Sequence, residues 1–531
     1  MVQDNFLVGD INANQRRIIE LAQSAAAQGA GLAVFPELAL TGYPPEDLLF
    51  RPGFIRQVEA AVDSIRQAVT TVDVILGLPR EHKGRMYNSA VWLHAGECIA
   101  EYHKQSLPNY AVFDEVRYFS HGKGTCVVAI NDVRFGLVIC EDAWEQEPVA
   151  DAKAAGADAV IVINASPFHG NKYDDRIDML QRRSRENGLP MFYVNMVGGQ
   201  DELVFDGESL VVDRTGSVIR RSAAFEPAIE LVDLTEDGPV AVTQGTSLAL
   251  PAEEAIYKAL VLGVKDFVTK NGFDGVIVGL SGGVDSALTL AIAVDALGAD
   301  NVQAVMMPSR YTSAMSREDA EAEARALGVR YDVISIESAF EAFLDSLAPV
   351  FSGAGVDTTE ENIQARCRGL ILMAISNKSG RMLLTTGNKS EMAVGYATLY
   401  GDMCGGFAPI KDVYKTLVYR LCHYRNSLGR VIPERVLTRA PSAELREAQV
   451  DQDSLPPYEV LDRILELSVE QDVPIDEVVE QGFERDTVEY VLALVQRNEY
   501  KRRQSAPGVR VTRRAFGRDR RYPITSGYRR R

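Results

Sequence analysis

The sequence predicts an α/β protein with two domains. Short runs rich in Val, Ile and Leu alternate along the chain with longer Ala-rich stretches of helical periodicity. At 531 residues the chain exceeds what one hydrophobic core normally organises. The alternation is also interrupted at 243–253, TQGTSLALPAE. We therefore expect a first domain at 1–245, a linker at 246–255 and a second domain at 256–531.

The first domain is expected to contain at least seven strands, each ending at polar, Gly or Pro residues. These strands are predicted at 31–37, 72–79, 88–94, 133–142, 158–166, 191–198 and 209–213. Helices are predicted between them at 14–29 and 54–69.

The second domain is expected to open with a helix at 255–272, followed by a buried strand at 275–280 and a helix at 287–298. Gly298 can cap the end of that helix. A later helix is expected to begin with a capping box of Thr358 and Glu361 and to carry Asn362 and Arg366 on one face. A further strand is predicted at 381–386.

The composition excludes several classes of protein. It is 46% hydrophobic and 24% charged, and no apolar segment is long enough to cross a bilayer. The first ten residues have neither the basic nor the apolar region of a secretory signal, which predicts a cytoplasmic location without a membrane partner. A net charge of −18 argues against nucleic acid as a partner.

The cysteines and histidines carry no metal signature. The six cysteines form no CxxC pair and the six histidines form no HExxH pattern, so a protein-bound transition metal is not expected. The basic C-terminal segment at 501–531 is open to two interpretations, a solvated tail or a partly docked one.

Three segments in the first half carry reactive groups where predicted strands end. They are FPEL with Glu37, YHK with Lys104 and VICEDAW with Cys140. Each alone is a weak signal, since a single cysteine, glutamate or lysine usually has no catalytic role. Amide hydrolysis through a thiol requires a nucleophile, a carboxylate base and a cation for the oxyanion, and together the three supply them.

These three motifs, in this order and spacing, resemble those of the nitrilase-like family over roughly the first 240 residues. The resemblance implies an α-β-β-α sandwich in which Cys140 is the nucleophile, Glu37 the general base and Lys104 the oxyanion partner, with Glu115 orienting Lys104. In glutamine-specific members the matching positions for glutamine are Tyr110, Ser166 and Lys172. The apolar strand that usually opens such chains is short or missing here.

A glycine-rich segment, SGGVDS at 281–286, lies between the predicted strand and helix that open the second domain. Glycines there allow backbone N–H groups to converge on phosphate oxygens, and the helix dipole adds to the attraction. No lysine follows as in GxxxxGK[ST], so this is not a kinase-type P-loop. Asp285 is the expected ligand of Mg²⁺ on the phosphates.

The segment resembles the PP-loop of ATP pyrophosphatases, which implies a Rossmann-like parallel sheet of the adenine nucleotide alpha-hydrolase type. ATP would lie on the strand end, the loop and the helix start. The residues so placed are Leu280, Ser281, Gly282, Gly283, Val284, Asp285, Ser286 and Ala287.

The segment at 383–416, LLTTGNKSEMAVGYATLYGDMCGGFAPIKDVYKT, resembles the signature of the NAD⁺ synthetase family. The resemblance implies that Thr386 and Lys415 bind ATP and that Glu391 binds deamido-NAD⁺ or Mg²⁺. Asn362 and Lys501 would contact deamido-NAD⁺. Arg366 is a possible second contact with this substrate.

Leu399 stands where simple ammonia-dependent members tend to have Lys, so the segment resembles the glutamine-dependent branch. That branch implies three small-molecule substrates, L-glutamine, ATP and deamido-NAD⁺, and a homo-oligomer, up to an octamer.

Two other functions remain open from the sequence. One is a related amidotransferase that adenylates a different acid, and the other is a nucleotide-sensing protein with an inactive amidase. The presence of Cys140, Glu37, Lys104 and Asp285 argues against the second, because a binding module needs neither catalytic set.

Overall fold

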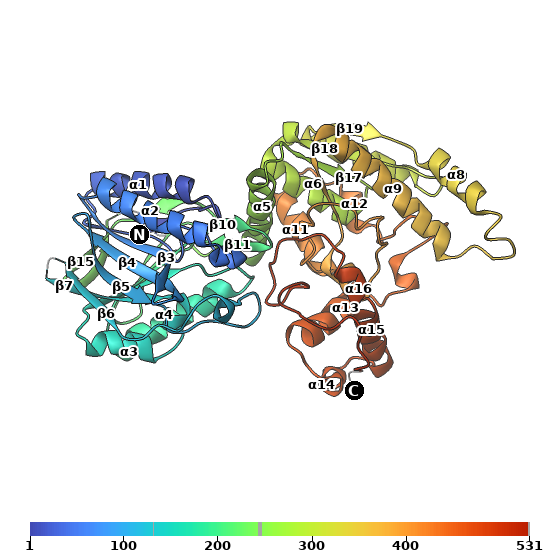
Figure 1. Cartoon of the computed structure of the whole chain (residues 1–531). Coiled ribbons are helices and arrows are strands. Elements are labelled where there is room, and N and C mark those ends of the chain that lie inside the picture. Colours follow the sequence, from blue (N-terminus) through green and yellow to red (C-terminus); the bar gives the residue numbers. More distant parts are fainter. Residues whose placement is uncertain (131, 243–246, 529–531) are drawn as a thin grey trace. The chain divides into compact units, whose positions relative to one another are not determined.

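The computed structural model describes residues 1–130, 132–242 and 247–528. The chain divides into two compact units, Met1–Ala252 and Glu253–Arg531 (Figure 1). Residues 243–246, where the first expected domain ends and the linker begins, lie outside the described residues. Within the described ranges no helix is long and apolar enough to cross a membrane.

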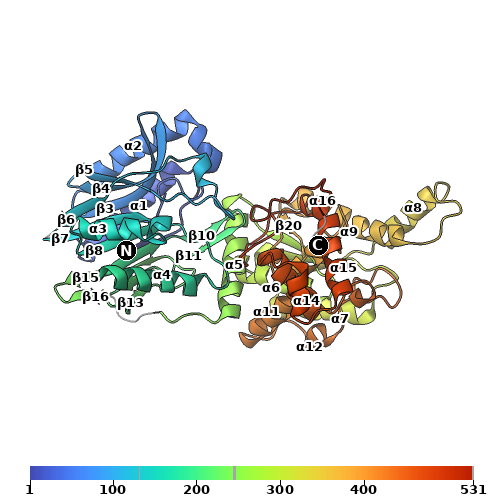
Figure 2. The ribbon, with the colours of Figure 1, turned by 90° about the horizontal axis from the view of Figure 1, so that it is seen from below.

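The first unit is a four-layer sandwich of helices, two sheets and helices (Figure 2). One sheet has the order β2-β3-β4-β5 and the other β13-β12-β9-β8-β7-β6. Helices α1 (Ile11–Ala27) and α2 (Pro52–Ala68) pack on the first sheet, and α3 (Glu147–Ala154) and α4 (Lys172–Asn187) on the second. The α-β-β-α expectation is thus confirmed.

The strands of these two sheets confirm the seven predicted positions and add others. Their bounds are β2 (Leu32–Val34), β3 (Asp73–His82), β4 (Arg85–His94), β5 (Glu97–His103), β6 (Cys126–Ile130), β7 (Val133–Ile139), β8 (Ala159–Asn164), β9 (Met191–Asn195), β12 (Leu210–Val212) and β13 (Val218–Arg221). The sequence-based predictions missed β5, β6 and β13. All three lie at sheet edges. Strands β5 and β6 are also mostly exposed or half-buried, so they lack a strong apolar pattern.

The first strand of the unit is short, as the sequence indicated. Strand β1 (Val2–Gln3) has two residues and pairs with β14 (Ala228–Ile229). The Gln3 side chain extends this contact by accepting from the Ser209 backbone N–H at 3.0 Å. Despite its length, the strand therefore holds the two ends of the unit together.

The second unit is built on a parallel sheet with the order β19-β18-β17-β20. The strands are β17 (Val276–Gly279), β18 (Val302–Met306), β19 (Arg330–Val333) and β20 (Met382–Leu384). The main helices are α5 (Ala252–Lys270), α6 (Val284–Leu297), α7 (Ala314–Leu327), α8 (Glu337–Leu347), α9 (Thr358–Ser379) and α11 (Lys415–Ser427). The predicted Rossmann-like parallel sheet is present.

Two helix-end predictions had different outcomes. Gly298 does cap the end of α6, with φ at 80°. The capping box of Thr358 and Glu361 is wrong, because the cap of α9 is Asp357, paired with Glu360. Both pairs have the required spacing of three residues, and the Asp357 carboxylate accepts from the Thr359 N–H at 2.7 Å.

Small helices and the C-terminal segment complete the second unit. They include α10 (Lys389–Val394), α12 (Glu434–Thr438), α13 (Tyr458–Leu465), α14 (Ile475–Glu480), α15 (Arg485–Arg497) and α16 (Glu499–Arg502). Val509, Val511 and Phe516 are buried in the unit. The segment up to that point is therefore docked, and the solvated-tail interpretation is wrong for it.

A buried lysine fixes this docking. The Lys389 ammonium donates to Thr512 Oγ1 at 2.6 Å and lies 2.8 Å from both Asp412 and Glu470. The Asp412 carboxylate in turn accepts from the Val511 N–H at 2.8 Å. A charge that is fully buried needs such partners, so the terminal segment is part of the core.

Candidate active sites

In the first unit a buried lysine links two glutamates. Lys104 Nζ lies 2.8 Å from Glu37 Oε1 and 2.9 Å from Glu115 Oε1. Asn88 donates to the same Glu37 oxygen at 2.7 Å, and the Ala165 N–H donates to the other at 3.0 Å. These bonds fix the carboxylate of Glu37.

Burial and charge oppose each other in this cluster. Burial disfavours the ammonium of Lys104, but the carboxylates of Glu115 and Glu37 outweigh it and raise its pKa well above the usual value. Burial raises the pKa of Glu115 to about 7, against the attraction of Lys104. Lys104 therefore stays a cation, while Glu115 titrates near neutrality.

Cys140 is the first residue of the single turn Cys140–Ala143 that follows β7. Its φ is 47°, in the left-handed region that a residue with a side chain rarely adopts. Burial and then the charge of Glu37 raise the pKa of the thiol well above the usual value, while Lys104 opposes them. The thiol is thus protonated at neutral pH, and Glu37 is a base within electrostatic reach.

Asp142 fixes the loop after Lys104 to the turn that carries Cys140. Its carboxylate accepts from the N–H groups of Gln105 at 3.0 Å and Ser106 at 2.8 Å. It also accepts from the Ile139 N–H, at 3.1 Å. The segments that carry Lys104 and Cys140 are therefore held together by one buried side chain, for which the sequence predicted no role.

Two of the residues predicted to bind glutamine, Tyr110 and Lys172, lie within electrostatic reach of Cys140. Tyr110 donates to Glu141 Oε1 at 2.9 Å, and Lys172 Nζ lies 4.4 Å from the centre of the Trp144 ring. Burial and then the charge of Arg176 lower the pKa of Lys172, and the carboxylates of Asp175 and Glu141 partly oppose this. A substrate α-carboxylate next to Lys172 would favour its charged form and raise its pKa again.

Ser166 is less accessible than the other two. It is 3% exposed, and its N–H donates to Asn195 Oδ1 at 3.0 Å. Its carbonyl accepts from Arg176 at 3.4 Å, and Arg176 also donates to Asp206 at 3.0 Å. Ser166 is therefore held by a buried polar network behind the thiol.

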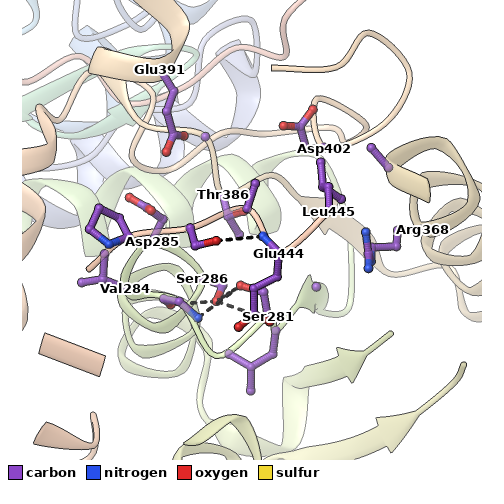
Figure 3. Close-up of a pocket in the computed structure, with 18 of the residues that line it drawn as sticks. Ser281, Val284, Asp285, Ser286, Arg368, Thr386, Glu391, Asp402, Glu444 and Leu445 are labelled. Carbon is purple, nitrogen blue, oxygen red and sulfur yellow. Dashed lines mark hydrogen bonds between the residues drawn. The ribbon is translucent and has the colours of Figure 1, made fainter. Parts of the chain in front are cut away.

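The second unit contains a cavity of about 280 Å³ over the glycine-rich loop (Figure 3). Figure 3 shows Asp285 and Glu391 on one side and Arg368 on the other. Of the residues predicted to bind ATP, the structure places these on the cavity wall: Leu280, Ser281, Gly283, Val284, Asp285, Ser286, Thr386 and Lys415.

Gly282 and Ala287 do not line the cavity. Gly282 has φ at 81° and a Cβ there would lie 2.3 Å from the carbonyl oxygen of Ser316, so the loop passes directly against the start of α7. Hydroxyl groups hold the turn, since Ser286 donates to the Gly283 carbonyl at 2.9 Å and Ser281 accepts from the Gly283 N–H at 3.2 Å. Only glycine fits at 282.

Lys415 connects the loop with the signature segment. Its ammonium donates to Asp285, and it lies 3.3 Å from Glu391 Oε1. Burial opposes its charge, but the carboxylates of Asp285 and Glu391 outweigh it and raise its pKa. Burial raises the pKa of Glu391 to about 8, and Asn388 donates to Asp285 Oδ1 at 2.9 Å.

Asn362 and Lys501, the residues expected to bind deamido-NAD⁺, do not line this cavity. Asn362 Oδ1 accepts from the Thr398 hydroxyl at 2.8 Å. Lys501 Nζ donates to the carbonyl oxygens of Gly395 and Ala397, both at 2.8 Å. The two residues therefore converge on one loop, 395–398, which continues from the helix carrying Glu391.

Sequence reasoning missed several residues that do line the cavity. Arg368, Asp402, Arg439, Glu444 and Asp451 have charged side chains there. Only Asp402 lies within a segment that the sequence analysis singled out as the signature. The rest reach the cavity through long-range folding.

Asp285 and Glu391 fit a magnesium ion bound together with phosphate. Mg²⁺ is usually held by one or two carboxylates, with substrate phosphates and waters completing the shell. In the described part of the chain no group of three or more His, Cys, Asp or Glu side chains is placed to hold a metal.

Two family models match the chain, "Carbon-nitrogen hydrolase" at 1–237 and "NAD synthase" at 256–505. The glutamine-dependent NAD⁺ synthetase of Xanthomonas campestris is 51% identical over 99% of this chain and 97% of that protein. The protein of this name from Aquifex aeolicus is 44% identical over 99% of each.

A solved structure of the glutamine-dependent NAD⁺ synthetase from Acinetobacter baumannii, in complex with adenosine diphosphate, is similar over the same range. It covers 99% of this chain and 97% of that chain, with 44% identity and a TM-score of 0.81. These similarities extend over both units and both sets of site residues. The chain therefore belongs to the family of glutamine-dependent NAD⁺ synthetases.

Proposed function

We propose that the first unit hydrolyses L-glutamine and that the second uses the ammonia to convert deamido-NAD⁺ to NAD⁺, with ATP cleaved to AMP and pyrophosphate. The observation that supports this best is the occurrence of two complete chemical sets in one chain. One is the buried Lys104 with its two glutamates beside Cys140, and the other is the cavity over the glycine-rich loop.

In the first unit Glu37 takes the thiol proton as Cys140 Sγ attacks the amide carbon of glutamine. The ammonium of Lys104 lies next to this pair and stabilises the oxyanion that develops. Glu37 then gives the proton to the departing ammonia, which leaves a glutamyl thioester. Water hydrolyses the thioester with Glu37 again as the base, and glutamate is released.

In the second unit a carboxylate oxygen of deamido-NAD⁺ attacks the α-phosphorus of ATP. The bond between this phosphorus and the bridging oxygen breaks, and its electron pair leaves with pyrophosphate. Ammonia then attacks the carbonyl carbon of the adenylate, which gives the amide and AMP. Lys415 would bind the phosphates, and Asn362 and Lys501 would contact deamido-NAD⁺.

Asp285 and Glu391 would hold Mg²⁺, which neutralises phosphate charge when it is bound. The proposal includes a cytoplasmic homo-oligomer, and light scattering on the purified chain tests the assembly.

Product analysis tests the whole reaction. We would incubate the purified chain with glutamine, Mg-ATP and deamido-NAD⁺ and identify the products by mass spectrometry. NAD⁺, AMP, pyrophosphate and glutamate in equal amounts are expected. Release of AMP with a different carboxylic acid, and none with deamido-NAD⁺, would instead identify a related amidotransferase.

A further inference from the structure

Three cations line the cavity of the second unit, and they have different partners. Lys415 contacts the carboxylates of Asp285 and Glu391. Arg368 donates to the carbonyl oxygen of Met307 at 3.1 Å, at the end of β18. Arg439 alone among these three donates to a backbone carbonyl of the glycine-rich loop, as described next.

The Arg439 guanidinium lies between the glycine-rich loop and the first turn of α7. Its Nη2 donates to the Gly282 carbonyl oxygen at 3.0 Å, and its Nη1 donates to Ser316 Oγ at 3.0 Å. The side chain is 25% exposed, so it is oriented by the protein but still open to the cavity. This position places a fixed positive charge beside the loop that would hold phosphate.

A carboxylate occupies the donors next to this arginine. Glu444 Oε1 accepts from Ser313 Oγ at 2.9 Å and Ser316 Oγ at 2.7 Å, and it lies 3.9 Å from Arg439 Nη1. Glu444 and Ser281, both labelled in Figure 3, line the same cavity. The two hydroxyls and the guanidinium thus form a set of donors that already holds an anion.

The proposed reaction places a larger anion at this loop. When the α-phosphorus is attacked, the electron pair of the broken bond passes to pyrophosphate, so charge grows on the leaving group. Guanidinium groups bind phosphate oxygens through two parallel N–H bonds, which suits them to this task.

We propose that Arg439 binds the pyrophosphate portion of ATP and the departing pyrophosphate, and that Glu444 is its counter-ion until the phosphates arrive. This rests on the proposed function. On binding, phosphate oxygens replace the Glu444 carboxylate beside Arg439, since both side chains line the cavity. Glu444 is displaced because two anions cannot share this position.

Product inhibition separates this role from a structural one. In ammonia-dependent synthesis, Arg439→Ala should raise the inhibition constant for pyrophosphate roughly 10–100-fold, and leave the inhibition constant for AMP unchanged. Arg439→Lys should recover part of the loss. Glu444→Gln should act in the opposite direction and lower the inhibition constant for pyrophosphate about threefold, because a competing charge is removed.

Arg446→Ala is the matched control. Arg446 lies on the same segment but pairs with Asp453 at 2.6 Å and does not line the cavity, so both inhibition constants should stay as in the parent chain. An Arg439→Ala chain in which the constants for pyrophosphate and AMP rise equally would overturn the proposal, because the change would then be a general distortion. Weaker pyrophosphate inhibition in Glu444→Gln would overturn the role of Glu444.

Direct binding keeps this test independent of the proposed function. If the parent chain makes no NAD⁺ and shows no exchange of pyrophosphate into ATP, the proposed function fails. Calorimetric titration with Mg-pyrophosphate then still decides the inference, since binding that Arg439→Ala does not weaken would refute it.

Discussion

The ammonium of Lys415 is hydrogen-bonded to the carboxylate of Asp285, although 130 residues separate them. Both side chains are largely buried, so removing one leaves an uncompensated charge in the cavity. The pair joins the glycine-rich loop to the signature segment. Changes at either residue should therefore affect ATP chemistry and leave glutamine hydrolysis in place.

Asp285→Asn should abolish NAD⁺ formation from glutamine and from ammonium chloride alike. The lost charge balances Lys415 and would hold the metal on the phosphates. We would measure NAD⁺ with each nitrogen donor at saturating Mg-ATP. Asp295→Asn, on the same helix but paired with Arg425 outside the cavity, should keep both activities. Near-normal ammonia-dependent synthesis in Asp285→Asn would disprove the assignment.

Cys140→Ala should lower the rate of glutamine-dependent synthesis by several orders of magnitude and leave the rate of ammonia-dependent synthesis largely intact. The thiol is needed only to release ammonia. Cys126→Ala, at a half-buried cysteine on a sheet edge, should change neither activity. A glutamine-mimicking electrophile should label Cys140, which peptide mass spectrometry checks, and an adduct on another cysteine would contradict the mechanism.

Glutamine hydrolysis should fall as the pH drops below about 7. The pKa of Glu115 is raised to about 7, so below that pH the carboxyl is neutral and no longer helps to hold Lys104. Glu115→Gln should lower kcat/KM for glutamine roughly 10–100-fold and remove this dependence. Ammonia-dependent synthesis should be unaffected. A variant that keeps the same acid limb would show that another group titrates there.

Glu323→Gln should remove a pH dependence of stability. The Glu323 carboxyl is fully buried with no hydrogen-bond partner among the described residues, and burial raises its pKa to about 8 from 4.5. Between pH 4.5 and 8 the unfolded chain releases a proton that the folded chain keeps. The free energy of unfolding therefore falls with rising pH across this window.

The free energy of unfolding of the parent chain should fall between pH 5 and pH 8, and that of Glu323→Gln should not. The variant should therefore gain roughly 1–3 kcal/mol of stability over the parent chain across this range. Urea unfolding of the second unit, followed at both values, measures this. Glu321→Gln, exposed on the same helix, should show no such gain. Parallel pH profiles of the parent chain and Glu323→Gln would refute the prediction.

Gly282→Ala should destabilise the second unit by roughly 1–3 kcal/mol or more. The residue has φ at 81°, and its Cβ would meet the Ser316 carbonyl oxygen. Gly283→Ala is the control, because there the Cβ would meet only Ser281 Oγ, at 3.3 Å. Thermal unfolding without nucleotide compares the two variants. Equal losses of stability would show that the contact of residue 282 with Ser316 does not cause the effect.

The sequence predicted those parts of the site that lie within local motifs. Glu37 and Cys140 each follow a strand with a clear apolar pattern, so their positions at strand ends could be anticipated, whereas Lys104 follows β5, which lacks such a pattern, and was found only from its motif. The same holds for the loop at 281–286, which lies between a buried strand and a helix.

Other features depend on choices or contacts that local patterns do not determine. Asp357 and Thr358 are both suitable helix caps with a glutamate three residues later, and only the folded geometry selects Asp357. Arg439 and Glu444 reach the cavity from a segment without a recognisable motif, through bonds to Ser316 over more than a hundred residues. Such contacts arise from tertiary packing, which periodicity does not encode.

The buried contacts of Lys389 with the C-terminal segment have a consequence for synthesis of the chain on the ribosome. Lys389 and Thr512 are 123 residues apart, so the signature segment waits for almost the entire chain before the hydrogen-bond partners of its buried ammonium are complete. The first unit, which closes when Ala228–Ile229 pairs with Val2–Gln3, can complete its sheets much earlier. During translation the amidase half therefore matures while the nucleotide half is still an incomplete core.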